Sequence, residues 1–166
     1  MTAPERSRTY QWQDPARSAA VVGKLSGLAF LEGMLAGKHP GPPIAASLDF
    51  TLAEVSEGFA VFTVEPKEFH YNPIGVVHGG LACTLLDSAM ACAIHSTLPA
   101  GRAYTTLELK VNLTRAITLA TGPLRCEGKI IHSGRQVATS EGRITGADGK
   151  LYAHGTTTCM IFEVKG

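Results

Sequence analysis

The feature that most constrains the fold is the run 79–97, in which apolar residues recur at helical spacing on nearly every side. It holds a single acid, Asp87, and a loop rich in glycine and proline, 71–77, leads into it. A helix that is apolar all round is normally buried. The run therefore predicts a long helix at the centre of the molecule, ended by Pro99 and Gly101.

Segments of alternating polarity flank this helix and predict strands. A half-buried strand places its apolar residues at every second position. Such strands are expected at 46–55, 59–64, 106–113, 123–132, 135–145 and 150–162, with turns at 56–58, 133–134 and 147–149. Hairpin connections make neighbouring strands antiparallel. The predicted fold class is therefore α+β, with an antiparallel six-stranded sheet wrapped around the long central helix.

The first part of the chain is expected to stand apart from this sheet. After a polar arm, 1–13, Asp14 and Pro15 have the residue types of a helix N-cap and first helical residue. Apolar residues at helical spacing then predict one extra N-terminal helix over 16–36, followed by a proline-rich linker at 39–43. The chain is thus expected to divide into an N-terminal arm and helix, 1–45, and a sheet domain, 46–166.

The composition excludes several classes of protein. The 166 residues are 45% hydrophobic and 17% charged, which argues against disorder. The formal net charge is +1 and no basic run is present, so a nucleic-acid partner is not expected. The segment 79–98 is long enough to span a membrane, but its central acid would cost about 2.5–3.5 kcal/mol there. The polar start has no signal-peptide pattern, and the four cysteines form no CxxC pair. A cytoplasmic protein with reduced thiols is therefore expected.

Asp87 is the residue in the central helix that most needs a partner. A buried carboxylate is costly unless it is paired, hydrogen-bonded or protonated. Thr84 lies one turn earlier and Ser88 is adjacent, so either hydroxyl is a candidate donor. Two interpretations of Asp87 remain open. It is either a structural acid, which is hydrogen-bonded in the core or faces solvent along a narrow polar stripe, or a catalytic carboxylate.

The start of the helix favours the catalytic interpretation. Gly79 and Gly80 have no side chains, so a ligand can approach the backbone closely. The first amides of a helix lack intrahelical partners, and the helix dipole favours negative charge there. Such amides can form an oxyanion site, and a nearby carboxylate can act as base or nucleophile on a carbonyl held there.

Two neighbouring polar residues are ambiguous. His78 either orients a substrate at the helix start or caps its own loop. Asn72 precedes Pro73 and Gly75, which is typical of a residue that makes an Asx turn.

The run N-P-x-G-x-x-H-G-G-x-x-x-T-L-L-D, residues 72–87, resembles the signature of hotdog-fold acyl-CoA thioesterases of the phenylacetate-degradation (PaaI-like) type. The order of predicted elements is similar to that family over about 46–162. The resemblance implies a hotdog fold and a hydrolase that cleaves an acyl-CoA, with an aromatic acyl group such as phenylacetyl as one option. It implies no metal or redox cofactor.

The same resemblance implies roles for particular residues. Asp87 matches the catalytic carboxylate, as general base or nucleophile, and Gly79 the residue whose amide polarises the thioester carbonyl. Asn72 and His78 match residues that position water or the thioester. A strand after the helix supplies a Ser or Thr that helps to hold the water; Thr106 is the first choice and Thr105 the second.

Other residues are expected to contact the substrate. Gly80 and Ser88 lie beside the catalytic pair, and Arg115 and Arg135, with Lys129, are candidates for the CoA phosphates, although each is also typical of a solvated charge. Leu81, Met90, Phe69 and the N-terminal helix are candidates for the acyl pocket. Family sites form between two subunits, so the resemblance implies a homodimer, paired further into a homotetramer.

Two alternatives remain. One is an enoyl-CoA hydratase or dehydratase on the same scaffold, with His78 and Asp87 as the reacting pair. The other is a non-catalytic acyl-CoA-binding protein, but the sequence has no basic recognition helix of the kind that a DNA-binding sensor needs. Motifs of other enzyme classes are absent, because the sequence contains no GxSxG, GxGxxG, phosphate-binding loop or HExxH motif.

Overall fold

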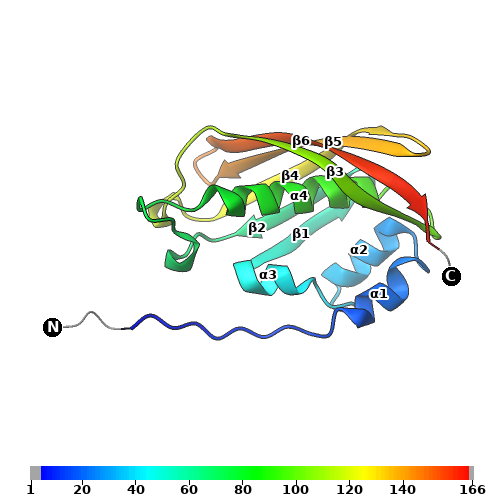
Figure 1. Ribbon diagram of the computed structural model, residues 1–166, viewed down its shortest axis with the longest axis horizontal. Coiled ribbons are helices and arrows are strands. Elements are labelled where there is room, and N and C mark those ends of the chain that lie inside the picture. The colour runs from blue at the N-terminus through cyan, green and yellow to red at the C-terminus, as the bar shows by residue number, and fades with distance from the viewer. Residues whose placement is uncertain (1–4, 165–166) are drawn as a thin grey trace.

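The computed structural model describes residues 5–164. A six-stranded antiparallel sheet, in the order β1-β2-β4-β5-β6-β3, wraps around the long helix α4 (Gly79–His95) (Figure 1). Its strands are β1 (Phe50–Ser56), β2 (Phe59–Val64), β3 (Arg102–Leu113), β4 (Leu124–Ser133), β5 (Val137–Gly146) and β6 (Leu151–Glu163). The predicted α+β class and the antiparallel sheet around one central helix are confirmed.

The sheet packs directly on the backbone of α4. A Cβ atom at Gly128 of β4 would lie 2.2 Å from the Ala89 carbonyl oxygen, so only glycine permits this approach. The Ser140 hydroxyl of β5 donates to the Met90 carbonyl at 2.9 Å. The main core cluster therefore lies between the inner face of the sheet and α4.

Helix α4 is not enclosed on every side, and the narrow polar stripe that the sequence left open is present. Most of its residues are buried, but a stripe along one face is only half-buried. This stripe consists of Gly80, Cys83, Thr84, Asp87, Ser88 and Cys92. The N-terminal segments and strand β3 flank it but do not close over it, so Asp87 is accessible from one side.

The single helix predicted over 16–36 is two helices, α1 (Ala16–Val22) and α2 (Gly27–Leu35). Gly23 ends the first, and the Ser26 hydroxyl caps the second by accepting from the Ala29 amide at 3.3 Å. The Gly27 amide donates to the Leu98 carbonyl at 2.9 Å. The break therefore lets α2 turn and dock on the C-terminal end of α4.

The strand predicted to begin at residue 46 begins later. A short helix, α3 (Pro43–Leu48), occupies this segment and runs across the predicted boundary at 45/46. A proline is favourable at its first position, and Asp49 reverses the chain in the left-handed region (φ 57°) before β1. Short 3-10 turns lie at Glu68–His70 and Leu119–Thr121, between the predicted strands and helix.

The predicted loose arm, 1–13, is described only from residue 5. From there the chain is extended (Figure 1), and the Arg8 guanidinium donates to the carbonyls of Ser47, at 2.6 Å, and Ala46, at 3.0 Å. No helix within residues 5–164 is long and apolar enough to cross a membrane.

Candidate active site

The start of α4 presents an amide with no partner. His78 is the N-cap, and its Nδ1 accepts from the Gly80 amide at 2.8 Å. No hydrogen bond to the Gly79 amide is found among residues 5–164. A Cβ atom at Gly79 would lie 2.5 Å from Leu113 Cδ1, so the missing side chain keeps this amide open beside β3. The predicted oxyanion site has the required open N–H donor.

The loop before α4 is held by its own asparagine. Asn72 Oδ1 accepts from the amides of Ile74, at 3.1 Å, and Val76, at 3.3 Å, which is the Asx turn that the sequence left open. Asn72, His78 and Gly79 line one cleft of about 300 Å³, and Arg115 lies in the same wall. We call this the helix-start cleft.

Asp87 receives its hydrogen bond from another element. The Thr106 hydroxyl of β3 donates to Asp87 Oδ1 at 3.0 Å. The expectation that Thr84 or Ser88 would donate is wrong, because their hydroxyls bond to the Gly80 and Thr84 carbonyls at 3.0 and 2.8 Å. Hydroxyls within a helix often bond back to the preceding turn in this way.

A bulge in β3 brings Thr106 to this position. The pairing with β6 shifts between Thr106 and Glu108, so the alternation predicted from the sequence breaks there. Leu107, expected to face the core, is 59% exposed. The polar Thr106 instead faces α4.

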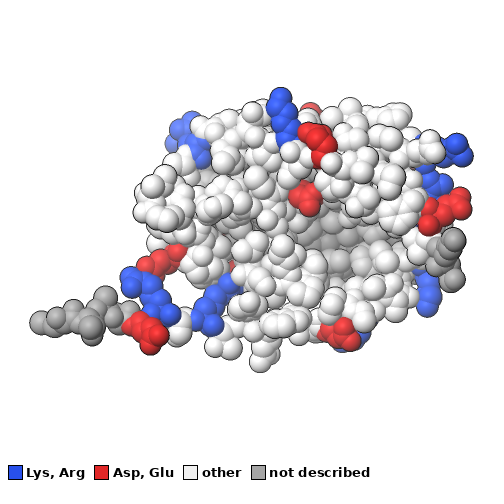
Figure 2. Space-filling model, viewed as in Figure 1, with Lys and Arg blue, Asp and Glu red and all other residues white. Residues whose placement is uncertain are grey.

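A second cleft of about 720 Å³ opens at Asp87. We call it the Asp87 cleft; α4 and β3 form one side, and α1, α2 and residues 40–43 form the other. Figure 2 shows it as a hollow whose walls are mostly white, with red atoms at one rim. Its lining includes the predicted residues Ser88, Thr105 and Thr106, together with apolar residues such as Phe30, Met34 and Phe62.

Three predicted pocket residues lie elsewhere. Leu81 and Met90 are buried in the core under the sheet, on the opposite side of α4 from the cleft. Phe69 is 47% exposed, and its ring contacts the Arg8 guanidinium at 3.8 Å. The N-terminal helices line the cleft as expected.

The cysteine on the cleft wall is not a nucleophile at neutral pH. Burial, with a smaller contribution from the charge of Asp87, raises the pKa of the Cys92 thiol to about 12. A thiol that remains protonated does not attack a carbonyl efficiently.

One chain keeps its two sets of candidate residues apart. Gly79 and Asp87 are eight residues apart on one helix, which is about 12 Å along the axis. They line two different clefts. A carbonyl held at the Gly79 amide is therefore out of reach of the Asp87 carboxylate in the same chain.

Comparison with known proteins gives the family. The model of the thioesterase superfamily matches residues 74–153. A Saccharolobus solfataricus protein described as an inferred esterase is 30% identical over 118 residues, which cover 71% of this chain and 82% of that protein. The solved structure of a phenylacetic acid degradation-related protein from Ralstonia eutropha is 31% identical, with a TM-score of 0.70 over 78% of this chain and 97% of that chain.

The chain belongs to the thioesterase superfamily. Human acyl-coenzyme A thioesterase 13 is also similar, with 28% identity over 110 residues, or 65% of this chain and 76% of that protein. The protein is thus a hotdog-fold thioester hydrolase. The matched region of the thioesterase contains Gly79, Asp87 and Thr106, whereas Asn72 and the N-terminal helices lie outside it.

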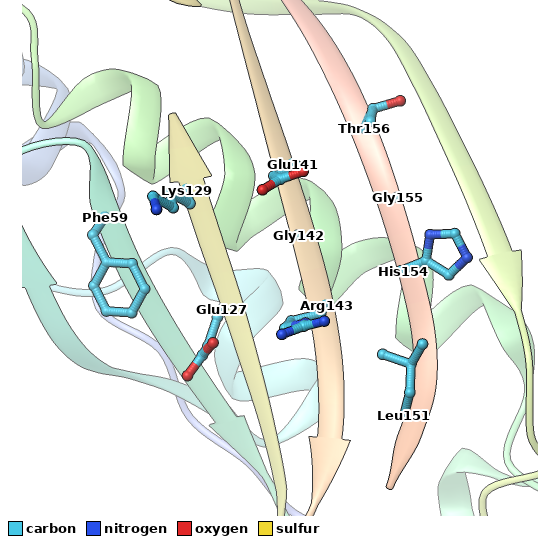
Figure 3. Close-up of a pocket in the computed structure, with 10 residues that line it drawn as sticks. All are labelled: Phe59, Glu127, Lys129, Glu141, Gly142, Arg143, Leu151, His154, Gly155 and Thr156. Carbon is cyan, nitrogen blue, oxygen red and sulfur yellow. The ribbon is translucent and has the colours of Figure 1, made fainter. Parts of the chain in front are cut away.

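The thioesterase has a third cleft, on the outer face of the sheet. Its volume is about 660 Å³, and Figure 3 shows side chains from β2, β4, β5 and β6 around it. Charges of both signs line it: Glu127, Lys129, Glu141 and Arg143. Of the predicted residues only Lys129 lies here, on the opposite face of the sheet from α4.

Arg135 is also distant from both candidate clefts of the thioesterase. It lies in the turn between β4 and β5, where its carbonyl accepts a hydrogen bond from the Arg102 guanidinium. Arg135 and Arg102 line a shallow hollow at this end of the sheet. Arg115 is therefore the predicted phosphate-binding arginine that lies with other candidate residues.

Proposed function

We propose that this thioesterase hydrolyses an acyl-CoA, with Asp87 as its catalytic carboxylate. The observation that carries the proposal is the Asp87 carboxylate, held by Thr106 at the mouth of a large, mostly apolar cleft. Such a cleft suits an acyl group, and the carboxylate is placed to act at the thioester. The name of the human relative supports CoA as the thiol, and that of the Ralstonia relative supports an aromatic acyl group such as phenylacetyl.

The complete site is proposed to form between two chains. Strand β3 lies at the edge of the sheet, and its exposed face includes Leu107 and Leu113, which are 59% and 56% exposed. Edge strands with apolar side chains are natural pairing surfaces. Pairing of β3 with β3 of a second copy brings the helix-start cleft of one chain toward the Asp87 cleft of the other. A homodimer, paired further into a tetramer, therefore remains our prediction.

The mechanism assigns one task to each group. The thioester carbonyl accepts a hydrogen bond from the Gly79 amide, which stabilises the oxyanion as the tetrahedral intermediate forms. Asp87 takes a proton from the attacking water, or attacks the carbonyl itself. The intermediate then collapses, and CoA leaves as a thiolate. When Asp87 is the nucleophile, this leaves a mixed anhydride on its carboxylate, which water then hydrolyses to release the free acid. The Thr106 hydroxyl donates to Oδ1 of Asp87, which leaves Oδ2 for the proposed contact with the water.

The polar residues of the helix-start cleft position the reactants. His78 Nδ1 and Asn72 Oδ1 are occupied by backbone amides, whereas no partner for His78 Nε2 or Asn72 Nδ2 is found in the described chain. These two nitrogens are proposed to orient the water or the thioester. Ser88 and Thr105 contact the acyl group, Gly80 leaves room for it, and Arg115 binds a CoA phosphate. Arg135 as a second phosphate ligand remains a prediction.

The test is the hydrolysis of a panel of acyl-CoA substrates, followed by a thiol-detecting reagent. Asp87→Asn should lower kcat by about 10²–10⁴-fold, because general acid–base groups contribute on that scale. Asp49→Asn is the matched control, since Asp49 is an exposed acid whose left-handed backbone suits asparagine. Circular dichroism should show both variants folded. Full turnover by Asp87→Asn would rule out the proposed role.

A further inference from the structure

The wall of the Asp87 cleft near the C-terminal end of α4 includes two polar side chains without hydrogen-bond partners. His95 of α4 is 4% exposed and lies between the rings of Phe30 and Tyr104, whose centroids are 5.6 and 5.2 Å from its own. Both His95 and Tyr104 line the cleft. Among residues 5–164, no hydrogen-bond partner is found for either ring nitrogen of His95 or for the Tyr104 hydroxyl.

The other buried histidine of the described chain, His70, has partners for both of its ring nitrogens, unlike His95. His70 is 5% exposed, and both of its ring nitrogens are bonded: Nδ1 to the Lys67 amide at 3.0 Å and Nε2 to the Leu48 carbonyl at 2.9 Å. Buried polar groups in folded proteins are normally satisfied in this way. A buried histidine that faces a cleft without a partner is therefore suited to a ligand that supplies one.

The charge of the cleft limits what that ligand carries. No lysine or arginine lines the cleft, and Asp87 is its one charged lining residue in the described chain. Burial lowers the pKa of His95 to about 4, so its ring is neutral at neutral pH. A ligand carboxylate beside His95 would have no cation to balance its charge, whereas an uncharged oxygen needs none.

The position of His95 defines which end of the acyl group it meets. Asp87, Ala91 and His95 follow one another at four-residue spacing, so they lie along one face of α4 and line the same cleft. The eight residues from Asp87 to His95 correspond to about 12 Å along the axis. An acyl group that has its carbonyl at Asp87 and lies along this face therefore has its far end at His95.

We infer that the substrate is a thioester whose acyl group carries an uncharged oxygen, a hydroxyl or keto group, at the end far from the thioester, and that His95 and Tyr104 bind this oxygen. The inference rests on the proposed function. A neutral imidazole offers one donor and one acceptor, and the Tyr104 hydroxyl adds a further donor. His95 and Tyr104 are thus specificity-determining residues rather than catalytic ones.

The experiment compares matched substrates. Hydrolysis is measured for pairs of acyl-CoA molecules that differ by one distal oxygen: an ω-hydroxyacyl or ω-1-ketoacyl chain against the unsubstituted chain, and a ring-hydroxylated arylacyl group against its parent. In the wild-type protein the oxygenated member of at least one pair should have a kcat/KM higher by at least about tenfold. The pair that shows the preference distinguishes hydroxyl from keto and chain from ring.

Two variants assign the preference to these side chains. His95→Phe and Tyr104→Phe keep the rings and remove the polar atoms, so each should reduce the ratio within the preferred pair by about fivefold or more. Met34→Leu, on the apolar wall of the same cleft, should change both members of a pair equally. If His95→Phe does not fold, Tyr104→Phe gives the same comparison.

The outcomes separate this inference from the proposed function. Equal kcat/KM values in every pair, or a ratio unchanged in both ring variants, would overturn the inference and leave the thioesterase proposal intact. If no member releases CoA, the proposed function fails. Calorimetric binding of the same pairs to Asp87→Asn then decides whether the cleft prefers the oxygenated ligand.

Discussion

At the scale of single residues, the two parts of the candidate site differ in how far the sequence revealed them. The open amide of Gly79 follows from its place at a helix start, where no intrahelical partner exists. The partner of Asp87 does not follow, because Thr106 is on a strand and reaches α4 only through a bulge. The candidate donors next to Asp87 in the helix bond to carbonyls of the preceding turn instead.

Gly79→Pro tests the amide directly. Proline lacks the N–H, yet it is favoured at the first position of a helix, and the extended backbone of His78 suits a following proline. Loss of one oxyanion donor should lower kcat by about 10²–10³-fold. Gly79→Ala is the control, because it adds the same Cβ beside the flexible end of Leu113 but keeps the N–H. Equal losses in the two variants would assign the effect to the side chain and contradict the amide role.

His95 gives a prediction for stability against pH. Burial lowers its pKa to about 4, whereas the ordinary value is 6.5. Below pH 6.5 the unfolded chain binds a proton at His95 that the folded chain does not bind. The free energy of unfolding therefore falls as the pH drops from 6.5 to 4, and below pH 4 His95 lowers it no further. The full loss is on the order of 3 kcal/mol. Urea unfolding should show a smaller difference in the free energy of unfolding between pH 7 and pH 5 for His95→Phe than for the wild type. The same difference in both proteins would contradict the role of His95.

At the scale of elements, the sequence identified strands and helices by period but misplaced breaks that depend on contacts. The helix expected over 16–36 divides at Gly23 to Ser26 because α2 docks on the end of α4. The strand predicted over 46–55 loses its first residues to α3, which has a proline at its first position. In both places a local pattern was overridden by a cap and by tertiary packing.

The contact between α2 and α4 at Gly27 can be tested by substitution. A Cβ atom there would lie 1.7 Å from the His95 carbonyl oxygen, so any side chain pushes α2 away from α4. Gly27→Ala should lower the free energy of unfolding by about 1–3 kcal/mol, as overpacking does in other cores. The wall that α2 contributes to the Asp87 cleft should loosen, which raises KM more than it lowers kcat. Both effects are measured by urea unfolding and by steady-state hydrolysis.

The control for this change is Gly41→Ala. No atom lies within 4 Å of a Cβ placed at Gly41, so the substitution should leave stability and KM nearly unchanged. A Gly27→Ala protein as stable as this control would mean that α2 is not held by its contact with α4.

At the scale of the whole molecule, each chain holds two half-sites. The helix-start cleft has the open amide and Arg115, and the Asp87 cleft has the carboxylate and the apolar walls. The free edge of β3 lies at the end of the sheet order. The proposal that a second copy completes each site therefore has a direct test.

Complementation between two inactive variants distinguishes a shared site from a site within one chain. Asp87→Asn and Gly79→Pro are co-expressed with different tags, and the mixed species is purified on both tags. Each mixed dimer has one site with both functional halves, so it should regain about half of the wild-type activity per dimer. Sites contained within one chain would give no recovery, and a protein that stays monomeric by sedimentation would exclude the shared site.

Local sequence patterns encode part of the fold and part of the candidate site. The apolar period placed α4, alternating polarity placed the strands from 59 onward, and the glycines after His78 marked the open helix start. Tertiary structure alone decided which face of α4 stays open, that Thr106 holds Asp87, and that His95 lies without a partner at the end of the cleft. The reason is physical: period and caps depend on neighbours in the chain, whereas the bulge in β3 and the docking of α2 depend on contacts between residues far apart in sequence.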